Sequence, residues 1–200
     1  VYDTWAKIAY DTATIIKATS NVIIDGFFID GIDSTRTSIA STAVNSLEHN
    51  AVYFFLSPAN VTLRNLDIYR VYFGIAGNAV TNSRILNNHI ADIGRDGVHL
   101  FSTATGNEIA ANTAERVYEA TAHGHGIKLN NASNNTVRNN TVRRANFGME
   151  FVSTGAGNRI YANDIVNVDT GVWFSGASGD SFTQNNIVGA KKLVEIASTG

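Results

Sequence analysis

The sequence predicts an all-β protein, a single-stranded right-handed parallel β-helix (a solenoid) with about six to eight rungs of 22–29 residues. A glycine followed by an apolar, an outward and an apolar residue recurs at a nearly constant interval, at Gly74, Gly97, Gly126, Gly148 and Gly171. A second pattern, aliphatic-x-x-Asn-x-aliphatic, recurs at the same intervals. The repeats hold short strands of period 2 and no amphipathic helix, so they must stack as parallel sheets to bury their apolar faces. Parallel crossovers favour the right-handed form.

The recurring asparagine has a structural role in such a solenoid. It stands at Asn88, Asn112, Asn140, Asn163 and Asn185. Amides stacked at one turn can bond to each other and to the turn backbone, which predicts an asparagine ladder. In the first rungs the same position holds Phe27 and Leu66, so we expect the ladder to give way there to an apolar stack.

The first quarter of the chain is the least regular. We expect residues 1–20 to form an irregular first rung or the tail of a missing one, and residues 21–33 to form the first clear repeat. Residues 34–50 are rich in Ser and Thr, which predicts a loop that leaves the solenoid. Ala51 then takes the glycine position, one rung before Gly74.

From residue 60 onward the rungs are nearly regular. One long turn, residues 114–125, lengthens its rung, and the last strand covers residues 193–196 with no cap after it. Because an open solenoid end pairs with other chains unless something covers it, we expect a further domain or a subunit contact there, as a homo-oligomer or by end-to-end stacking. We expect residues 1–200 to be one domain of a longer protein, since the chain begins at Val1 without Met.

The composition excludes several classes of function. The net charge of −2 does not indicate a nucleic-acid partner, which would favour a strongly basic chain. The absence of cysteine excludes disulfides and thiolate metal sites, and we assign no metal ligands. No apolar run is long enough to cross a bilayer.

Alternation of side chains predicts an exposed column of residues along the outer face of the glycine-type strands. Its members are Tyr53, Ala76, His99, Lys128, Glu150, Trp173 and Glu195. A second column, just before each glycine, holds Asn50, Phe73, Asp96, His125, Phe147 and Thr170. Neighbouring rungs lie about 4.8 Å apart, so the ionisable members of both columns should meet. The long turn supplies Glu119 and His123 near the same edge.

This cluster predicts a site for a polysaccharide. We take the candidate catalytic residues to be His99, Lys128, Glu150, Asp96 and His125, and the candidate substrate-binding residues to be Tyr53, Trp173, Glu119, His123 and Arg143. Chemistry at C5 of a uronic acid needs a cation to stabilise the enolate, together with a base and an acid. A hydrolase would instead place two carboxylates roughly 6.5–9.5 Å apart, for which Asp96 and Glu150 are candidates.

The same residues also fit a protein without catalysis. Lys128 beside Glu150 is what an ordinary cross-strand ion pair looks like, and Trp173 is equally suited to an oligomer contact. A structural or adhesive β-helix, such as a tailspike shaft, a surface-protein segment or an assembly unit, is therefore the alternative function. Whether the protein is an enzyme stays open at this point.

Residues 94–100 (GRDGVHL) and 125–130 (HGIKLN) resemble successive rungs of the parallel β-helix repeat family of mannuronan C5-epimerases, alginate and pectate lyases, NosD-like periplasmic proteins and phage tailspikes. The resemblance covers residue 21 to the end. It implies polysaccharide processing in an extracellular, cell-surface or periplasmic location, with an acidic polysaccharide as partner and often with Ca²⁺. The epimerases carry the phrase Tyr-Gly-Phe-Asp-Pro-His-Glu, whereas residues 73–79 read FGIAGNA, without its Tyr, Asp and His. Asp30 and Asp33 could share a calcium ion, although such a pair around a glycine is commonly a turn.

Overall fold

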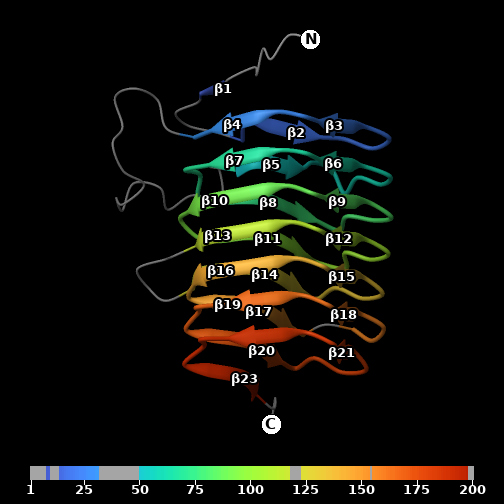
Figure 1. Ribbon diagram of the computed structural model, residues 1–200. Helices are drawn as coiled ribbons and strands as arrows, with labels where there is room; N and C mark the ends of the chain where they lie inside the picture. Colours follow the sequence, from blue (N-terminus) through green and yellow to red (C-terminus); the bar gives the residue numbers. More distant parts are fainter. Residues whose placement is uncertain (1–7, 10–13, 32–49, 118–122, 154, 198–200) are drawn as a thin grey trace.

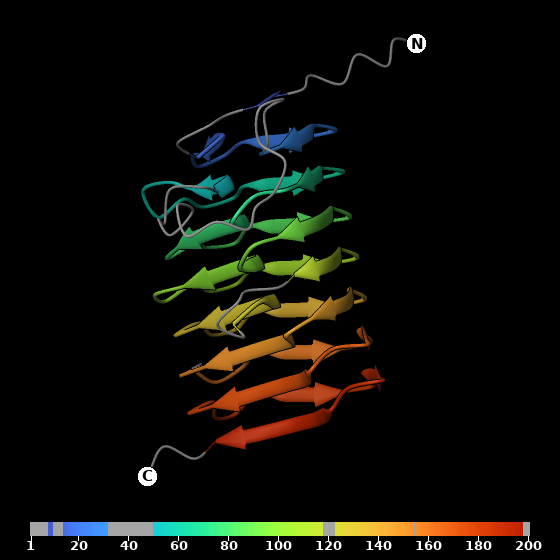
Figure 2. The same ribbon diagram turned by 90° about the vertical axis from the view of Figure 1, so that its left-hand side faces the viewer.

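The computed structural model describes residues 8–9, 14–31, 50–117, 123–153 and 155–197. Its 23 strands form three parallel sheets, and the chain visits the sheets in turn so that each circuit adds one rung (Figures 1 and 2). The predicted all-β solenoid of stacked parallel rungs is therefore confirmed. No helix long and apolar enough to cross a membrane occurs in the part of the chain that is described.

The strands of each sheet follow one another at intervals of one rung. Sheet A consists of β1 (Ile8–Ala9), β4 (Phe28–Asp30), β7 (Asp67–Tyr69), β10 (His89–Ile93), β13 (Thr113–Val117), β16 (Thr141–Ala145), β19 (Asp164–Val166) and β22 (Asn186–Val188). Sheet B consists of β2 (Ile16–Ala18), β5 (Asn50–Phe54), β8 (Phe73–Asn78), β11 (Asp96–Phe101), β14 (His125–Asn130), β17 (Phe147–Val152), β20 (Thr170–Ser175) and β23 (Lys192–Ala197). Sheet C consists of β3 (Ile23–Asp25), β6 (Thr62–Arg64), β9 (Arg84–Leu86), β12 (Glu108–Ala110), β15 (Thr136–Arg138), β18 (Arg159–Tyr161) and β21 (Ser181–Thr183).

The core is a set of columns of apolar side chains that run along the solenoid axis. In sheet B one such column is Ile75, Val98, Ile127, Met149 and Val172, each paired in register with the next. All five side chains are buried. Because each rung buries its apolar face only against its neighbours, the core is continuous and no single rung is stable alone.

The recurring glycine of sheet B is required by a close approach of backbones. A Cβ atom placed at Gly97 would lie 2.6 Å from the carbonyl oxygen of Gly126 in the next rung and 3.2 Å from the Cβ of Ala114. Since the first contact is to backbone, the neighbour cannot move aside. The glycine phrase therefore marks the corner at which the chain passes from sheet A into sheet B.

The predicted asparagine ladder is present and buried. The Asn112 side-chain amide donates to the Ile85 carbonyl oxygen at 2.9 Å and to Asn140 Oδ1 at 3.0 Å. Its own Oδ1 accepts from both the backbone and the side-chain nitrogen of Asn88. Leu66, 1% exposed, takes the same position in an earlier rung, which confirms the predicted change to an apolar stack.

A second ladder was not predicted. It runs through Ser83, Asn107, Asn135, Asn158 and Asp180 at the turn that precedes sheet C. The same bonding pattern recurs in it, with each side-chain oxygen accepting a backbone N–H from the preceding rung. The two ladders satisfy the polar groups of two of the turns in each rung, which are too deep for water to reach.

Two predicted boundaries change. The long turn was predicted to begin at residue 114, but β13 continues to Val117 because Ala114 and Val117 both pack into the core. The loop predicted for residues 34–50 lies outside the described residues, except for Asn50, which begins β5.

We predict that Asn112→Ala destabilises the fold severely. The substitution removes one acceptor and two donated hydrogen bonds, and it leaves several buried groups unsatisfied at about 1–3 kcal/mol each. We expect a loss on the order of 3–5 kcal/mol in the free energy of unfolding, measured by urea denaturation. Asn186→Ala is the matched control, since the Asn186 amide donates to Asp164 at an exposed position, and it should cost less than about 1 kcal/mol. Equal losses in the two variants would contradict a structural role for the ladder.

Candidate active site

The two predicted outer columns have the register expected from the sequence. Asp96 is paired with His125, His99 with Lys128, and Lys128 with Glu150. Asp96 and His99 are three residues apart on β11, yet their side chains meet, with His99 Nδ1 within ion-pair distance of Asp96 Oδ2. Strands β11, β14 and β17 thus bring all five candidate catalytic residues together.

These five side chains form one continuous line of contacts, which we call the ionic chain. His99 Nδ1 lies 2.9 Å from Asp96 Oδ2, and Asp96 Oδ1 lies 2.6 Å from His125 Nδ1. His125 Nε2 lies 2.5 Å from Glu150 Oε2, which is also 2.7 Å from Lys128 Nζ. The Asp96–His125 contact is a well-aligned hydrogen bond. The His99–Asp96 and His125–Glu150 contacts are within ion-pair distance but lack that alignment.

The prediction that this face is exposed is wrong for most of the ionic chain. Asp96, His125 and Glu150 are only 0%, 1% and 3% exposed, and Ala76 is buried as well. Only His99 and Lys128 reach solvent, with side chains 13% and 14% exposed. One physical reason for this burial is that aromatic rings pack against the charged side chains.

That cover comes from rings of the same two columns. The Phe147 ring stacks on His125 with ring centroids 4.9 Å apart, and Trp173 stacks in turn on Phe147 at 5.6 Å. The outer columns contain rings as well as charges, and the rings close over the charged groups. The inner part of the ionic chain is thereby shielded from water.

Burial and pairing act against each other on the pKa values of the ionic chain. Burial by itself would raise the pKa of Asp96, but the hydrogen bond from His125 and the contact with His99 outweigh it and hold that pKa well below its ordinary value. Burial would also raise the pKa of Glu150, but His125 and Lys128 lower it overall. For His125 burial favours the neutral ring, yet the two carboxylates raise its pKa. The two carboxylates therefore favour the imidazolium form of His125.

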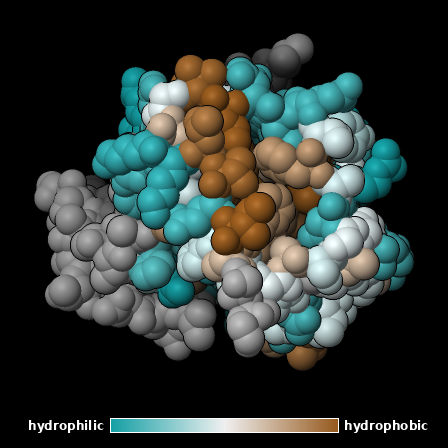
Figure 3. Space-filling view, turned by 90° about the horizontal axis from the view of Figure 1, so that it is seen from below, coloured by the Kyte–Doolittle hydropathy of each residue, from teal (hydrophilic) through white to brown (hydrophobic). Residues whose placement is uncertain are grey.

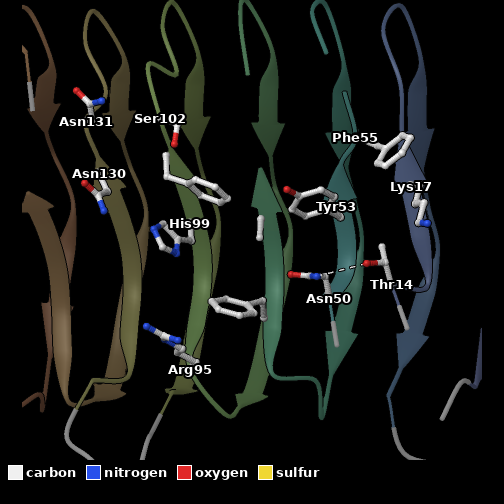
Figure 4. Close-up of a pocket in the computed structure, with 13 residues that line it drawn as sticks. Thr14, Lys17, Asn50, Tyr53, Phe55, Arg95, His99, Ser102, Asn130 and Asn131 are labelled. Atoms are coloured by element: carbon white, nitrogen blue, oxygen red, sulfur yellow. Dashed lines mark hydrogen bonds between the residues drawn. The ribbon is translucent and has the colours of Figure 1, made fainter. Parts of the chain in front are cut away.

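A cavity of about 870 Å³ lies beside the ionic chain on the outer face of sheet B, and His99 is part of its wall (Figure 4). Its aromatic lining consists of Tyr53, Phe55, Phe73 and Phe101. Its polar lining includes Lys17, Arg95, Asn50, Asn130 and Asn131. Two cations and no carboxylate are among these lining residues.

The cavity exists because the outer column contains a small residue at this point. Ala76 is paired with Tyr53 on one side and with His99 on the other. Its methyl group leaves a hollow between the two larger side chains. Phe73 and Ala76, which line the cavity, form a small apolar cluster with Tyr72. Within this hollow the His99 ring lies between two phenyl rings, with centroids 6.1 Å from Phe73 and 5.1 Å from Phe101.

The predicted substrate-binding residues divide into those at the site and those elsewhere. Tyr53 lines the cavity, and Trp173 lies at the far end of the ionic chain beside Glu150. His123 is exposed, with its ring 6.4 Å from that of His125. Arg143 does not reach the site, because it belongs to sheet A and its Nε donates to Glu115. Glu119 lies outside the described residues.

Two further sequence expectations concern cations. Lys128, the cation among the candidate catalytic residues, has its Nζ bound to Glu150 and does not line the cavity. Of the proposed calcium pair, Asp30 forms an ion pair with Arg70, and Asp33 lies outside the described residues. In the described part of the chain, no group of three or more His, Asp or Glu side chains is arranged to hold a metal ion.

Sequence reasoning missed the cations of the cavity. Lys17 belongs to the same outer column as Tyr53, one rung earlier, and extending the column by one rung would have found it. Phe101 is the next outward position after His99 on β11 and is found by the same alternation. Arg95 lies in the turn before β11, where no strand period applies, so the sequence carried no signal for it.

Comparison with known proteins identifies the class of the fold. A family model described as "Right handed beta helix region" matches residues 10–188. The chain therefore belongs to the right-handed β-helix family, which confirms the predicted handedness and the resemblance found in the sequence. No curated protein matches the sequence.

Among solved structures, the fold is similar to three carbohydrate-active proteins. The chain aligns with DFA-IIIase from Arthrobacter chlorophenolicus A6 at 14% identity and a TM-score of 0.60, covering 78% of this chain and 38% of that one. It aligns with an alginate lyase from Paenibacillus sp. str. FPU-7 at 13% identity and a TM-score of 0.59, covering 90% of this chain and 67% of that one. It aligns with the periplasmic alginate epimerase AlgG at 16% identity and a TM-score of 0.54, covering 91% of this chain and 43% of that one. At such identities the likeness shows the fold, and the chain spans less than half the length of the first and third of these structures.

We predict that stability depends on pH through the ionic chain. His125, with a raised pKa, stabilises the fold fully below its ordinary value of 6.5 and loses that contribution as pH rises through its pKa in the folded protein. Asp96 and Glu150, with lowered pKa values, contribute above their ordinary values of 3.8 and 4.5 and lose this as pH falls. The free energy of unfolding should thus be highest between about pH 4.5 and 6.5, measured by chemical denaturation across pH. His125→Gln should remove the alkaline decline, whereas the exposed His123→Gln should keep it. An unchanged alkaline decline in His125→Gln would show that another group causes it.

Proposed function

We propose that this protein is a carbohydrate-active β-helix that acts on an acidic polysaccharide in the manner of a lyase or epimerase, in an extracellular or periplasmic location. The observation that carries the proposal is the position of His99. Among the described residues, it alone both lines the cavity and belongs to the ionic chain. A group that can move a proton is thereby placed against a space large enough for sugar rings.

The lining of the cavity supports an anionic carbohydrate as ligand. Lys17 and Arg95 supply positive charge, and the guanidinium of Arg95 lies 5.5 Å from the centroid of the Phe73 ring. Tyr53 and Phe101 offer faces on which sugar rings can stack, and Asn130 offers an amide for hydroxyl groups. The similar structures include an alginate lyase and an alginate epimerase, and alginate is an acidic polysaccharide.

The arrangement favours proton abstraction over hydrolysis. A glycoside hydrolase needs two carboxyl groups at the scissile bond. Asp96 and Glu150 are both buried and paired with cations, and neither lines the cavity. A lyase or epimerase needs a base for the C5 proton and positive charge near the uronate carboxylate, which develops negative charge as the proton leaves. In our proposal His99 is the base, and Arg95 or Lys17 faces the carboxylate.

The two reactions differ in the step that follows. When His99 removes the C5 proton, the electron pair is delocalised into the carboxylate. In a lyase that pair then forms the C4–C5 double bond as the C4–O bond breaks, and the leaving oxygen takes the proton that His99 removed. In an epimerase a water molecule in the cavity protonates the opposite face of C5, and the hydroxide left behind takes the proton from His99. Asp96, His125, Glu150 and Lys128 support His99 in both cases and do not touch the sugar.

We predict that the purified protein converts at least one member of a panel of alginate, pectate and other acidic polysaccharides, assayed with and without Ca²⁺. Products with unsaturated ends would identify a lyase, and inverted C5 centres an epimerase, both read by NMR and mass spectrometry. His99→Gln should lower turnover by about 100-fold or more with an unchanged melting temperature. His89→Gln, which alters a histidine of sheet A bonded to Tyr69, is the matched control and should retain activity.

Two outcomes would contradict this proposal. If no polysaccharide changes under any condition, the protein is not a lyase or epimerase of acidic glycans. If turnover occurs but His99→Gln retains it, the base is another residue.

A second candidate function, a structural or assembly unit, is favoured by the C-terminal end of the solenoid. Leu193 is 58% exposed, Val194 46% and Ile196 78%, and Val188 is 51% exposed beside them. Viewed from that end, apolar side chains gather in a band with polar ones around it (Figure 3). Among the described residues, β21, β22 and β23 are the last strands of their sheets, and their outer edges can pair with a further rung or with a strand from a second copy.

We predict that this end mediates self-association. Replacing Leu193 and Ile196 together by lysine should abolish it, because each added charge would have to be desolvated at the contact. Sedimentation velocity over a concentration series measures the effect, with Asp164→Lys on the lateral face of sheet A as the control for added charge. A wild-type chain that stays monomeric at all concentrations would rule out assembly through this end.

A further inference from the structure

Asp96 is a buried carboxylate with a histidine on each of its two oxygens. Oδ1 accepts a hydrogen bond from His125 Nδ1 at 2.6 Å, and Oδ2 lies 2.9 Å from His99 Nδ1. Asp96 is 0% exposed, so water does not compete for either oxygen. The two histidines differ in their surroundings: His125 is enclosed, whereas His99 lines the cavity.

The surroundings of Asp96 Oδ2 determine which nitrogen of His99 carries the proton. No hydrogen-bond donor other than His99 reaches this oxygen within the described part of the chain. A proton on Nδ1 provides the missing donor after a small rotation of the ring, while a proton on Nε2 would set the Nδ1 lone pair against a carboxylate oxygen. An unsatisfied buried carboxylate oxygen is strongly unfavourable, so the Nδ1–H tautomer is the stable one.

That tautomer leaves Nε2 of His99 as a lone-pair acceptor. Nε2 is buried and has no hydrogen-bond partner among the described residues. His99 is packed between Phe73 and Phe101 in the cavity wall, and these rings compete for no proton. The basic nitrogen therefore has no competing donor among the described residues, and because it is buried, the ring must move before a ligand in the cavity can reach it.

The other four members of the ionic chain balance one another's charge. His125 faces Asp96 at Nδ1 and Glu150 at Nε2, which requires a proton on both nitrogens. Lys128 closes the chain at Glu150 Oε2, and His123 is the other titratable group beside the His125 ring. The charges of Asp96, Glu150, His125 and Lys128 then sum to zero.

We propose that Asp96 is a positioning residue that fixes His99 as the neutral Nδ1–H tautomer and, through its second oxygen, holds His125 as a buried imidazolium. Its meaning for catalysis rests on the proposed function, in which His99 Nε2 is the base. The arrangement of the two rings does not depend on that function and can be measured in the free protein.

The test is a long-range ¹H–¹⁵N NMR spectrum of the protein with ¹⁵N-labelled histidine, recorded from pH 5 to 9 and assigned with single histidine variants. We expect the His125 ring to show two protonated nitrogens at neutral pH. We expect neutral His99 to show a pyrrole-type shift at Nδ1 and a pyridine-type shift at Nε2, the reverse of the tautomer that prevails in free histidine. A pyridine-type Nδ1 in wild-type His99 would overturn the proposal.

Three variants separate positioning from general support of the fold. In Asp96→Asn, His99 should revert to the Nε2–H tautomer and the pKa of His125 should fall. In Glu150→Gln, the pKa of His125 should fall while the His99 tautomer stays unchanged, because Glu150 contacts only His125 and Lys128 of the ionic chain. Asp164→Asn, at an exposed carboxylate of sheet A, should leave both rings unchanged. If Glu150→Gln alters the His99 tautomer as Asp96→Asn does, Asp96 has no specific role.

Failure of this inference is distinguishable from failure of the proposed function. The NMR result is obtained without substrate, so it stands or falls even if no polysaccharide is converted. If turnover is found, Asp96→Asn should lower kcat on the order of 100-fold and displace the limb of the pH–rate profile assigned to His99. A loss of kcat with an unchanged profile and tautomer would assign Asp96 a purely structural role.

Discussion

Parallel pairing in strict register between successive rungs is the constraint on which the rest of this structure depends. Each residue therefore lies next to the equivalent residue of the following rung, roughly 4.8 Å away. Apolar positions then stack into a continuous core, and asparagine stacks on asparagine because the amide both donates and accepts. Glycine recurs in sheet B for the same reason, since the close approach at Gly97 is repeated from rung to rung. A one-residue slip would disturb every column at once.

The same register sets the rule for charged residues. Identical charges cannot stack as asparagines do, so a column of ionisable groups persists only if its signs alternate or neutral rings separate them. The ionic chain satisfies this requirement: each carboxylate lies against a cation, and aromatic rings cover the inner members. Burying any one of these charges alone would carry a large desolvation penalty, and the penalty is smaller for the set because its charges compensate one another. A buried ion pair of this kind adds little net stability compared with well-packed apolar residues of similar volume.

The cavity and the ionic chain both depend on which residues occupy the outer columns. Where the column contains the small Ala76, a hollow opens on sheet B, and where it contains charges, the chain forms. His99 stands at the boundary between them. This position gives one imidazole a buried carboxylate behind it and an aromatic, cationic cavity in front.

The sequence by itself determined the solenoid, the period of its rungs, the main asparagine ladder and the five members of the ionic chain, because all of these repeat in register and periodicity is visible in one dimension. Only the tertiary structure decided their burial, the binding of Lys128 to Glu150, and the placement of Arg143 on another sheet. It also revealed the cavity with Lys17 and Arg95. These properties depend on the direction of long side chains and on turns between strands, and neither follows a strand period.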